Sequence, residues 1–218
     1  MKIQILKSAA IVSLFAIGQS LMADPAFVNG SLTGPIANTL PPPGWSTIAG
    51  TPDTMDAAHN VGVTYVGYGA TPSGPSPDGG TWVGFANGQG GYKEIFGQMV
   101  SGFTVGQAYQ ISWYQGNFGA DVGYIGTNSI AVTVGGVYVG SGDTLGLSSN
   151  WYSDSVTFVA SAANLQINFG LTDDVSAYLS IDGISLSAAN APDSGATIAL
   201  LGVAGLALAG MRRKVRRA

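Results

Sequence analysis

The sequence predicts an all-β fold, an antiparallel β-sandwich, between two short terminal segments of different character. Three observations favour this fold. Val, Ile, Thr, Tyr and Phe are common between residues 24 and 190, and Gly is abundant. Runs of the helix-forming residues Ala, Leu, Glu and Lys are nearly absent there. About nine short apolar segments follow one another at regular spacing with turn residues between them, which is typical of a sandwich.

The first half of this region is expected to hold short strands between loops rich in Pro and Gly. The prolines of the PPPG segment at 41–44 make the chain stiff and deny it donors for a sheet, so an extended segment begins only at Trp45. Residues 70–80 read as a loop of Pro, Gly and Ser. The segments with strand patterns are 27–32 (FVNGSL), 61–68, 82–85 and 92–100.

The second half shows the clearer alternation. In residues 108–115, Tyr109, Ile111 and Trp113 alternate with polar residues, which predicts a strand with one buried face. Residues 129–139 predict a hairpin, because the Gly135-Gly136 pair stands between two alternating runs. A glycine-rich loop is expected at 116–127. The remaining predicted strands are 151–159, 165–171 and 178–186.

The N-terminal segment has the layout of a secretory signal peptide. Lys2 and Lys7 precede an apolar core at residues 9–17, and Leu21-Met22-Ala23 offers a cleavage site. We therefore expect residues 1–23 to form a signal helix that is removed, with a mature domain at residues 24–190.

The C-terminal segment, residues 191–218, contains three parts in a fixed order. A turn-forming motif comes first, an uncharged apolar run at 196–211 follows, and a basic tail at 212–218 ends it. Sixteen helical residues reach about 24 Å, against a bilayer core of ~30 Å. The cations favour the cytoplasmic side. The motif is Ala191, Pro192, Asp193, Ser194 and Gly195, and the basic residues are Arg212, Arg213, Lys214, Arg216 and Arg217.

This tail resembles the PEP-CTERM class of bacterial sorting signals, in its VPDSG-CTERM variant. Ala191 stands where that variant has Val, and Pro192, Asp193, Ser194 and Gly195 match. The resemblance implies that residues 196–211 form a transmembrane helix and that an exosortase-type membrane transpeptidase cuts the chain near the motif. The protein would then be exported and transferred to the cell envelope or exopolysaccharide, after transient anchoring in the inner membrane. The alternative is an anchor that is never cut.

Charge and cysteine content narrow the function classes. Residues 24–190 hold eleven of the twelve acids and a single cation, Lys93, a formal charge of −10. Such a domain repels nucleic acid and anionic lipid, and suits neutral glycans or divalent cations better. The sequence has no Cys, which excludes disulfides and thiolate chemistry.

The strand order is also similar to the galactose-binding-like jelly rolls of carbohydrate-binding modules. The resemblance rests on FVNGS, PPGW, the DGG before TWVGFAN, EIFGQMVSGFTVGQAYQISWYQ and YLSIDGISL. Such modules often hold a structural calcium. Asp182 matches an acidic position of that pattern, whereas Leu32 and Thr33 stand where the opening segment would carry its acid. No cofactor is required, and two interpretations of Asp182, Asp173 and Asp174 stay open: ligands of one structural Ca2+, or acids in solvated turns.

Aromatic side chains are candidates for stacking on sugar rings. Loop-borne Trp45 and Tyr124 are expected to be more exposed than Trp82 or Trp113. For each of these side chains, packing in the core is the competing interpretation. The candidate ligand-binding residues are Trp45, Tyr68, Tyr124 and Trp151.

The pattern of acids does not predict an enzyme. Glu94 is the only Glu of the domain, and a glycosidase needs a pair of carboxylates. Asp53, Asp56 and His59 lie close in sequence, but a polar loop explains them as well, and no Gly-x-Ser-x-Gly motif is present. The sequence thus indicates a non-catalytic surface or matrix protein, structural or glycan-binding. The alternatives are a secreted hydrolase acting on polysaccharide and a structural adhesin without a ligand.

Overall fold

The structure, a computed structural model, describes residues 24–60, 67–88, 90–120 and 123–189. These residues form ten β-strands and no helix, as the composition predicts. The strands are β1 (Ser46–Ala49), β2 (Asp53–Met55), β3 (Trp82–Asn87), β4 (Ile95–Ser101), β5 (Ala108–Gly116), β6 (Ile130–Val134), β7 (Val137–Ser141), β8 (Tyr152–Val159), β9 (Asn164–Leu171) and β10 (Ala177–Ala188).

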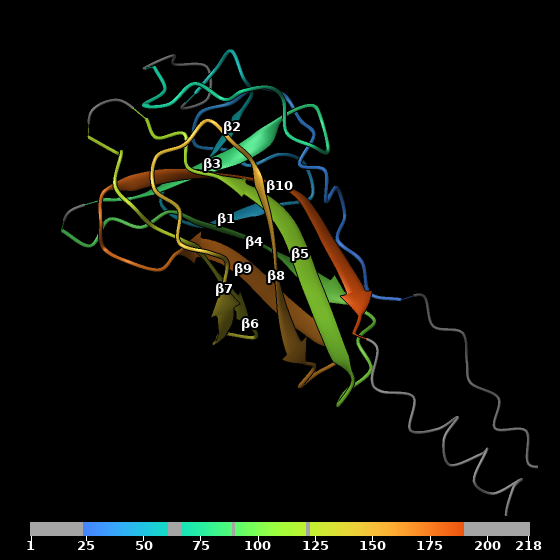
Figure 1. Ribbon diagram of the computed structural model, residues 1–218. Helices are drawn as coiled ribbons and strands as arrows, with labels where there is room; N and C mark the ends of the chain where they lie inside the picture. Colours follow the sequence, from blue (N-terminus) through green and yellow to red (C-terminus); the bar gives the residue numbers. More distant parts are fainter. Residues whose placement is uncertain (1–23, 61–66, 89, 121–122, 190–218) are drawn as a thin grey trace, which may run out of the picture.

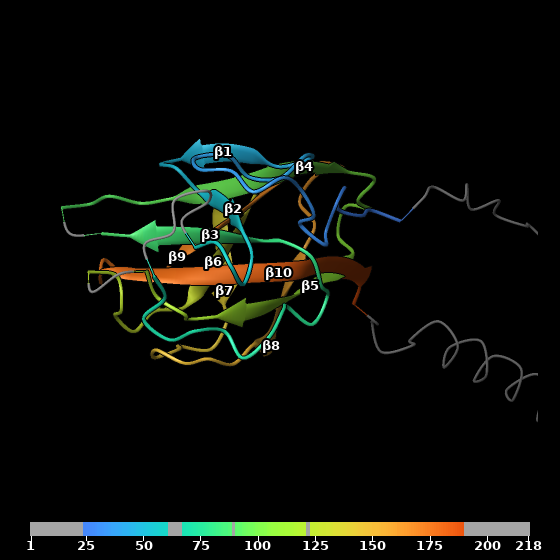
Figure 2. The ribbon, with the colours of Figure 1, turned by 90° about the horizontal axis from the view of Figure 1, so that it is seen from above.

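The strands make two five-stranded antiparallel sheets that pack face to face (Figures 1 and 2). The first sheet has the order β1-β4-β9-β6-β7, and the second has the order β2-β3-β10-β5-β8. Strand β10 lies at the centre of the second sheet, between β3 and β5. The predicted β-sandwich is therefore confirmed.

The main core fills the space between the sheets, because each strand turns every second side chain inward. In β5 the inward residues Tyr109, Ile111 and Trp113 are at most 3 % exposed. Leu179 and Ile181 of β10 meet them from the same sheet, and Phe96 and Phe169 stack from the other sheet with ring centroids 5.6 Å apart. The alternation predicted for residues 108–115 is thus confirmed.

The outer face of the second sheet is also buried over part of its area. Trp82 and Tyr178 point away from the main core and form a second apolar cluster with Met55, Ala86 and Ala120. The long loops gather at the end of the sandwich that lies away from the two chain ends (Figure 1). Tyr68, Tyr124 and Trp151 reach this second cluster from those loops.

The strand expected at residues 27–32 is wrong. Those residues form a turn, in which Asn29 and Leu32 have φ angles of 56° and 48°. The Asn29 side chain closes the turn, since its Oδ1 accepts the Thr33 N–H at 3.1 Å and its Nδ2 donates to Pro43 O at 2.8 Å. Asn adopts this left-handed region more readily than most residues. The apolar Leu32 is buried as an anchor of the turn.

Some predicted elements lie outside the described residues, and one observed strand was not predicted. Residues 61–66 of the strand expected at 61–68 lie outside the described residues, and Gly67 and Tyr68 are not in a strand. Strand β2 was not expected, because its three residues are too short for an alternation to show. The predicted signal helix (1–23) and transmembrane helix (196–211) also lie outside the described residues. The part of the chain that the structure describes contains no helix long and apolar enough to cross a membrane.

Candidate functional site

A pocket of about 330 Å³ opens on the outer face of the second sheet. Its floor comes from strand positions that alternate with core residues. Asp53 of β2 lies opposite Gly84 of β3, and Tyr178 of β10 lies opposite Ala86. Its walls come from the loops. The lining residues are Asn38, Thr39, Thr51, Asp53, Ala86, Tyr92, Glu94, Ala120, Tyr124 and Tyr178.

Gly84 makes room for the floor of the pocket. A Cβ atom at this position would lie 2.2 Å from Met55 Sδ and 2.4 Å from Tyr178 Cε1. Real Cβ atoms do not approach neighbours this closely, so only Gly allows the Tyr178 ring to cross β3 here.

Asp53 is one of two buried carboxylates in the pocket, with 3 % of the residue exposed. Its Oδ1 accepts the Thr39 N–H at 2.8 Å, and its Oδ2 accepts the Tyr178 hydroxyl at 2.7 Å. Burial raises the pKa of Asp53, and these two hydrogen bonds oppose the rise. The pKa of Tyr178 is raised well above its usual value by burial and by the charge of Asp53.

Glu94 is the second carboxylate, with 4 % of the residue exposed. The hydroxyls of Thr51 and Tyr92 each donate to its Oε1 at 2.7 Å, and the Ala86 N–H donates to its Oε2 at 2.6 Å. Burial raises the pKa of Glu94, and the negative charge of Asp53 adds to the rise. The charge of Asp53 therefore acts on the ionisation of Glu94.

Thr39 is held in an unusual backbone conformation beside Asp53. Its φ angle is 62°, in the left-handed region, which is a rare conformation for a β-branched residue. Such strain amounts to about 1–3 kcal/mol and is found where the surrounding structure holds a functional group in place. Here the strained residue directs its N–H at the carboxylate.

The four predicted ligand-binding aromatics are in different places. Tyr124 lines the pocket. Trp45 was expected to be more exposed than Trp82 or Trp113, and it is 7 % exposed against their 0 % and 1 %. The competing interpretation, core packing, describes it, because it stacks on Phe27 and Phe96 in the main core. Its indole N–H donates to Asn29 O at 2.8 Å. Tyr68 and Trp151 are half-buried against the second apolar cluster, outside the lining of the pocket.

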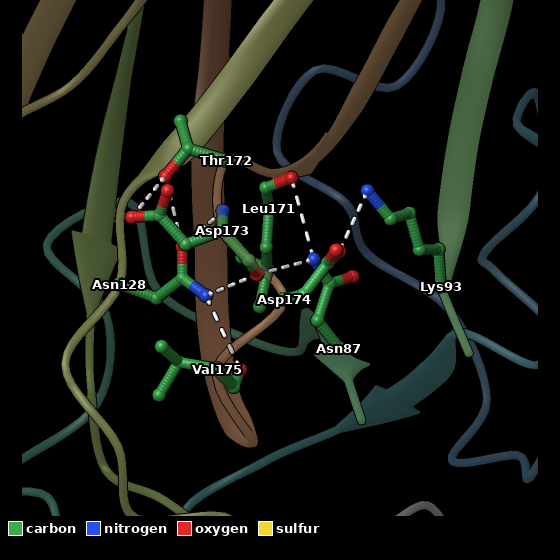
Figure 3. Close-up of polar contacts among 8 residues, drawn as sticks. All are labelled: Asn87, Lys93, Asn128, Leu171, Thr172, Asp173, Asp174 and Val175. Atoms are coloured by element: carbon green, nitrogen blue, oxygen red, sulfur yellow. Dashed lines mark hydrogen bonds and ion pairs between the residues drawn. The ribbon is translucent and has the colours of Figure 1, made fainter. Parts of the chain in front are cut away.

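Asp173 and Asp174 lie in the turn between β9 and β10, which Asn128 fastens (Figure 3). Asn128 Nδ2 donates to Asp173 O at 2.9 Å, and its Oδ1 accepts the Thr172 hydroxyl at 2.9 Å. The Asp174 carboxylate is 2.9 Å from the Lys93 ammonium (Figure 3). These two acids are therefore exposed turn residues with their own partners.

Asp182 lies apart from that turn, inside β10 on the outer face of the sheet, opposite Tyr114. The residue is 0 % exposed, and neither of its carboxylate oxygens has a hydrogen-bond partner of ordinary geometry. Burial raises its pKa to about 7; the Ser76 hydroxyl and the Gly183 N–H lie near enough to oppose the rise, and the charge of Asp78 adds to it. The described residues include no group of three or more His, Cys, Asp or Glu placed to hold a metal.

Asp56 and His59, the alternative acid–base pair, form a local turn instead. His59 Nδ1 is 2.8 Å from Asp56 Oδ1, and the two residues make an isolated β-bridge. Neither residue lines the pocket.

The sequence analysis did not bring Asp53, Tyr92, Glu94 and Tyr178 together in one pocket. One local signal was present for two of them: Tyr92 and Glu94 are two residues apart in an extended segment, which places their side chains on one face. Asp53 approaches these residues only through the pairing of β2 with β3, which no local sequence pattern indicates.

The comparisons with known proteins concern the tail and the fold separately. The VPDSG-CTERM motif matches residues 192–215, which confirms the predicted sorting motif. No curated protein matches the sequence.

Several solved structures are similar in fold, and three illustrate their range. TmCBM61 in complex with β-1,4-galactotriose is 13 % identical, with a TM-score of 0.44, over 75 % of this chain and 98 % of that chain. A family 35 carbohydrate-binding module from Clostridium thermocellum is 12 % identical, with a TM-score of 0.40, over 71 % and 97 %. The enzymatically active domain of bacteriophage CBA120 tailspike protein 4 is 12 % identical, with a TM-score of 0.41, over 66 % of this chain. The match spans 19 % of the tailspike chain.

Proposed function

We propose that this is an exported surface protein whose β-sandwich binds a glycan, without catalysis, in the pocket above Tyr178. One observation carries the proposal: tyrosine rings and hydrogen-bonding groups converge on a single cavity. Tyr92, Tyr124 and Tyr178 offer aromatic surface, while Asn38, Thr39 and Thr51 surround it with polar groups. Sugars are held in this way, by a ring face against an aromatic side chain and by hydroxyls against polar groups.

The way the carboxylates are held favours binding over hydrolysis. Glu94 accepts three hydrogen bonds and Asp53 accepts two, all from donors of the protein itself. A general acid for glycoside hydrolysis needs a carboxyl O–H directed at the leaving oxygen. Carboxylates surrounded by donors act as fixed acceptors and fixed negative charge instead.

The rival function, hydrolysis of a polysaccharide, is favoured by one observation, the presence of two carboxylates of raised pKa in one pocket. It predicts that reducing ends appear when the protein is incubated with the polysaccharide it binds. Their absence, together with saturable binding, supports the non-catalytic function.

The C-terminal tail supports the part of the proposal that concerns export and attachment at the cell surface. Its sorting motif, apolar run and basic end suit recognition by an exosortase-type transpeptidase after export. The protein would lie transiently in the inner membrane and then be attached to the cell envelope or the exopolysaccharide. The pocket would thus be displayed at the cell surface.

We place the proposed structural Ca2+ at Asp182 rather than at Asp173 and Asp174. Asp182 fits a cation, because its two buried oxygens have no hydrogen-bond partner of ordinary geometry, and Asp78 and Ser76 lie nearby. Ca2+ requires six to eight oxygens, of which these three residues supply part. Its charge would stabilise the ionised Asp182. Calcium is then expected to raise the Tm of the native sequence at pH 8 and to leave that of Asp182→Asn unchanged.

The test of glycan binding uses the full chain in mild detergent and the host's own extracellular polysaccharide. Titration calorimetry is expected to show saturable binding that Tyr124→Ala weakens by about tenfold or more. Tyr138→Ala is the control, since Tyr138 lies on the β6–β7 hairpin and is 59 % exposed outside the pocket. No binding, with or without calcium, would favour the ligand-free structural protein.

A further inference from the structure

The described lining of the pocket contains two buried carboxyl groups and no basic side chain. Asp53 and Glu94 are 3 % and 4 % exposed, and the described residues that donate hydrogen bonds to their oxygens do so through neutral hydroxyls or backbone N–H groups. Burial of an ionised group is unfavourable unless an opposite charge or strong hydrogen bonds compensate it. The charge of Asp53 makes Glu94 more costly to ionise.

The described part of the chain places no cation in the pocket. Lys93 is the single Lys or Arg among the described residues, and its ammonium is 2.9 Å from Asp174 (Figure 3). Lys93 directly precedes Glu94 in an extended segment, so the two side chains point to opposite faces. His59 pairs with Asp56. Because the described residues supply no positive charge to the pocket, a ligand can supply it.

From this we infer that the pocket selects a basic amino sugar, whose protonated amine lies between Asp53 and Glu94 while its ring lies against the tyrosines. This inference rests on the proposed glycan-binding function and names the class of sugar. The three tyrosine rings favour a cation as well as a sugar face, because the π surface of an aromatic ring attracts positive charge. Neutral sugars lack the charge, and uronic acids are repelled.

The dimensions and the polar groups favour an amino sugar over other amines. A cavity of about 330 Å³ has room for a sugar ring, and Asn38, Thr39 and Thr51 can hydrogen-bond to its hydroxyls. A linear polyamine or a lysine side chain has no ring hydroxyls to hydrogen-bond with these polar groups. A metal ion is less suited, because the described residues place no third acid beside the pair.

Three tetrasaccharides with the same β-1,4-linked backbone test the effect of the sugar's charge on binding. They carry a protonated amine, an acetamide or a hydroxyl at C2 of each unit: the glucosamine, N-acetylglucosamine and glucose tetramers. We expect titration calorimetry of the full chain at pH 6 to show the glucosamine tetramer binding at least about tenfold more tightly than the other two. Equal binding of the three tetramers would overturn the inference and leave the proposed function standing.

Charge-neutral variants of the two carboxylates provide a second test of the inference. In Asp53→Asn the amide can still accept from the Thr39 N–H and can donate to the Tyr178 hydroxyl. In Glu94→Gln it can accept from the Ala86 N–H and donate to Thr51 or Tyr92. Each variant is expected to reduce the ratio of the affinity for the glucosamine tetramer to that for the glucose tetramer about tenfold. An unchanged preference would overturn the inference.

Further experiments test whether the variants fold, whether other amines bind and whether the pocket binds a glycan at all. Thermal unfolding of the two variants verifies that the fold persists, and it is expected to persist because the hydrogen bonds are retained. Spermidine and a lysine-rich peptide test the other sources of an amine, and affinity equal to that of the glucosamine tetramer would overturn the choice of a sugar. Failure of all three tetramers and of the host polysaccharide would instead overturn the proposed function itself.

Discussion

The Tyr178 hydroxyl donates a 2.7 Å hydrogen bond to Asp53, across 125 positions of the sequence. This bond joins β10, at the centre of the second sheet, to β2, at its edge. It also fixes the carboxylate that lines the pocket.

Removal of this hydroxyl should weaken the fold. In Tyr178→Phe, Asp53 Oδ2 loses its donor while the carboxylate stays buried. The free energy of unfolding is expected to fall by about 1–3 kcal/mol, the usual effect of a buried polar group left without a partner. Urea unfolding of the variant measures it. The control is Tyr138→Phe, on an exposed hydroxyl, which should stay within about 0.5 kcal/mol; equal effects of the two changes would contradict the role of the bond.

Asp182 makes stability depend on pH. Its pKa is raised from 3.8 to about 7 in the folded protein. The native state therefore binds a proton more tightly than the unfolded state does, so stability is greatest below pH 4 for this group and falls as the pH rises to about 7. The raised pKa values of Asp53 and Glu94 act in the same direction.

The contribution of Asp182 can be measured separately. Asp182→Asn should reduce the fall in the free energy of unfolding between pH 4 and pH 7 by up to about 4 kcal/mol. Urea unfolding at pH 4, 5.5, 7 and 8.5, without calcium, compares the two proteins. A decline of the same size in both would show that Asp182 is not the responsible group.

Asn128 should be essential to the turn between β9 and β10. The residue is fully buried, and its side chain makes hydrogen bonds with Ser129, Thr172, Asp173 and Val175. Asn128→Ala leaves several of these groups without partners, and a loss of about 3 kcal/mol is expected. The measurement is again urea unfolding.

The neighbouring ion pair supplies the control for that change. Lys93→Met removes the bond to Asp174, whose side chain is 71 % exposed. Exposed ion pairs contribute about 0–1 kcal/mol, so this variant should differ little from the native protein. If Lys93→Met had the larger effect, the assignment of the turn's stability to Asn128 would be wrong.

The basic end of the chain should be needed for sorting. Deletion of residues 212–217 removes the five cations that favour the cytoplasmic side. Retention or processing is expected to fall, as measured by the share of mature protein in the envelope and in the medium. Replacement of the same cations by Lys is the control and should preserve sorting. Unchanged processing of the deletion would defeat the proposed role of the tail.

The fold was predictable where one face of a strand is buried. Residues 108–115 and 165–171 show this alternation in the sequence, and the structure confirms it in β5 and β9. The turn at residues 27–32 was not predictable in the same way. Its apolar residues suit a strand, and the hydrogen bonds of Asn29 that reverse the chain involve Thr33 and the distant Pro43.

The pocket was less predictable than the fold. Glu94 was considered alone because its partners, Thr51 and Ala86, approach it only through pairing between distant segments. Trp45 was expected to be more exposed than Trp82 or Trp113 because it follows a proline-rich loop, with core packing as the alternative. Its surroundings come from Phe27, Phe96 and Phe169, which no local pattern connects.

The central position of β10 also has a mechanical consequence. The pocket contains Tyr178, near the first residue of this strand, and the described chain leaves the sandwich just beyond its last residue, Ala188. At ~3.3 Å per residue these two positions are about 33 Å apart. A pulling force between a bound ligand and the tail would run along β10 and shear its ladders with β3 and β5 together. Many hydrogen bonds would then bear the load in parallel, which is the arrangement that resists detachment under flow.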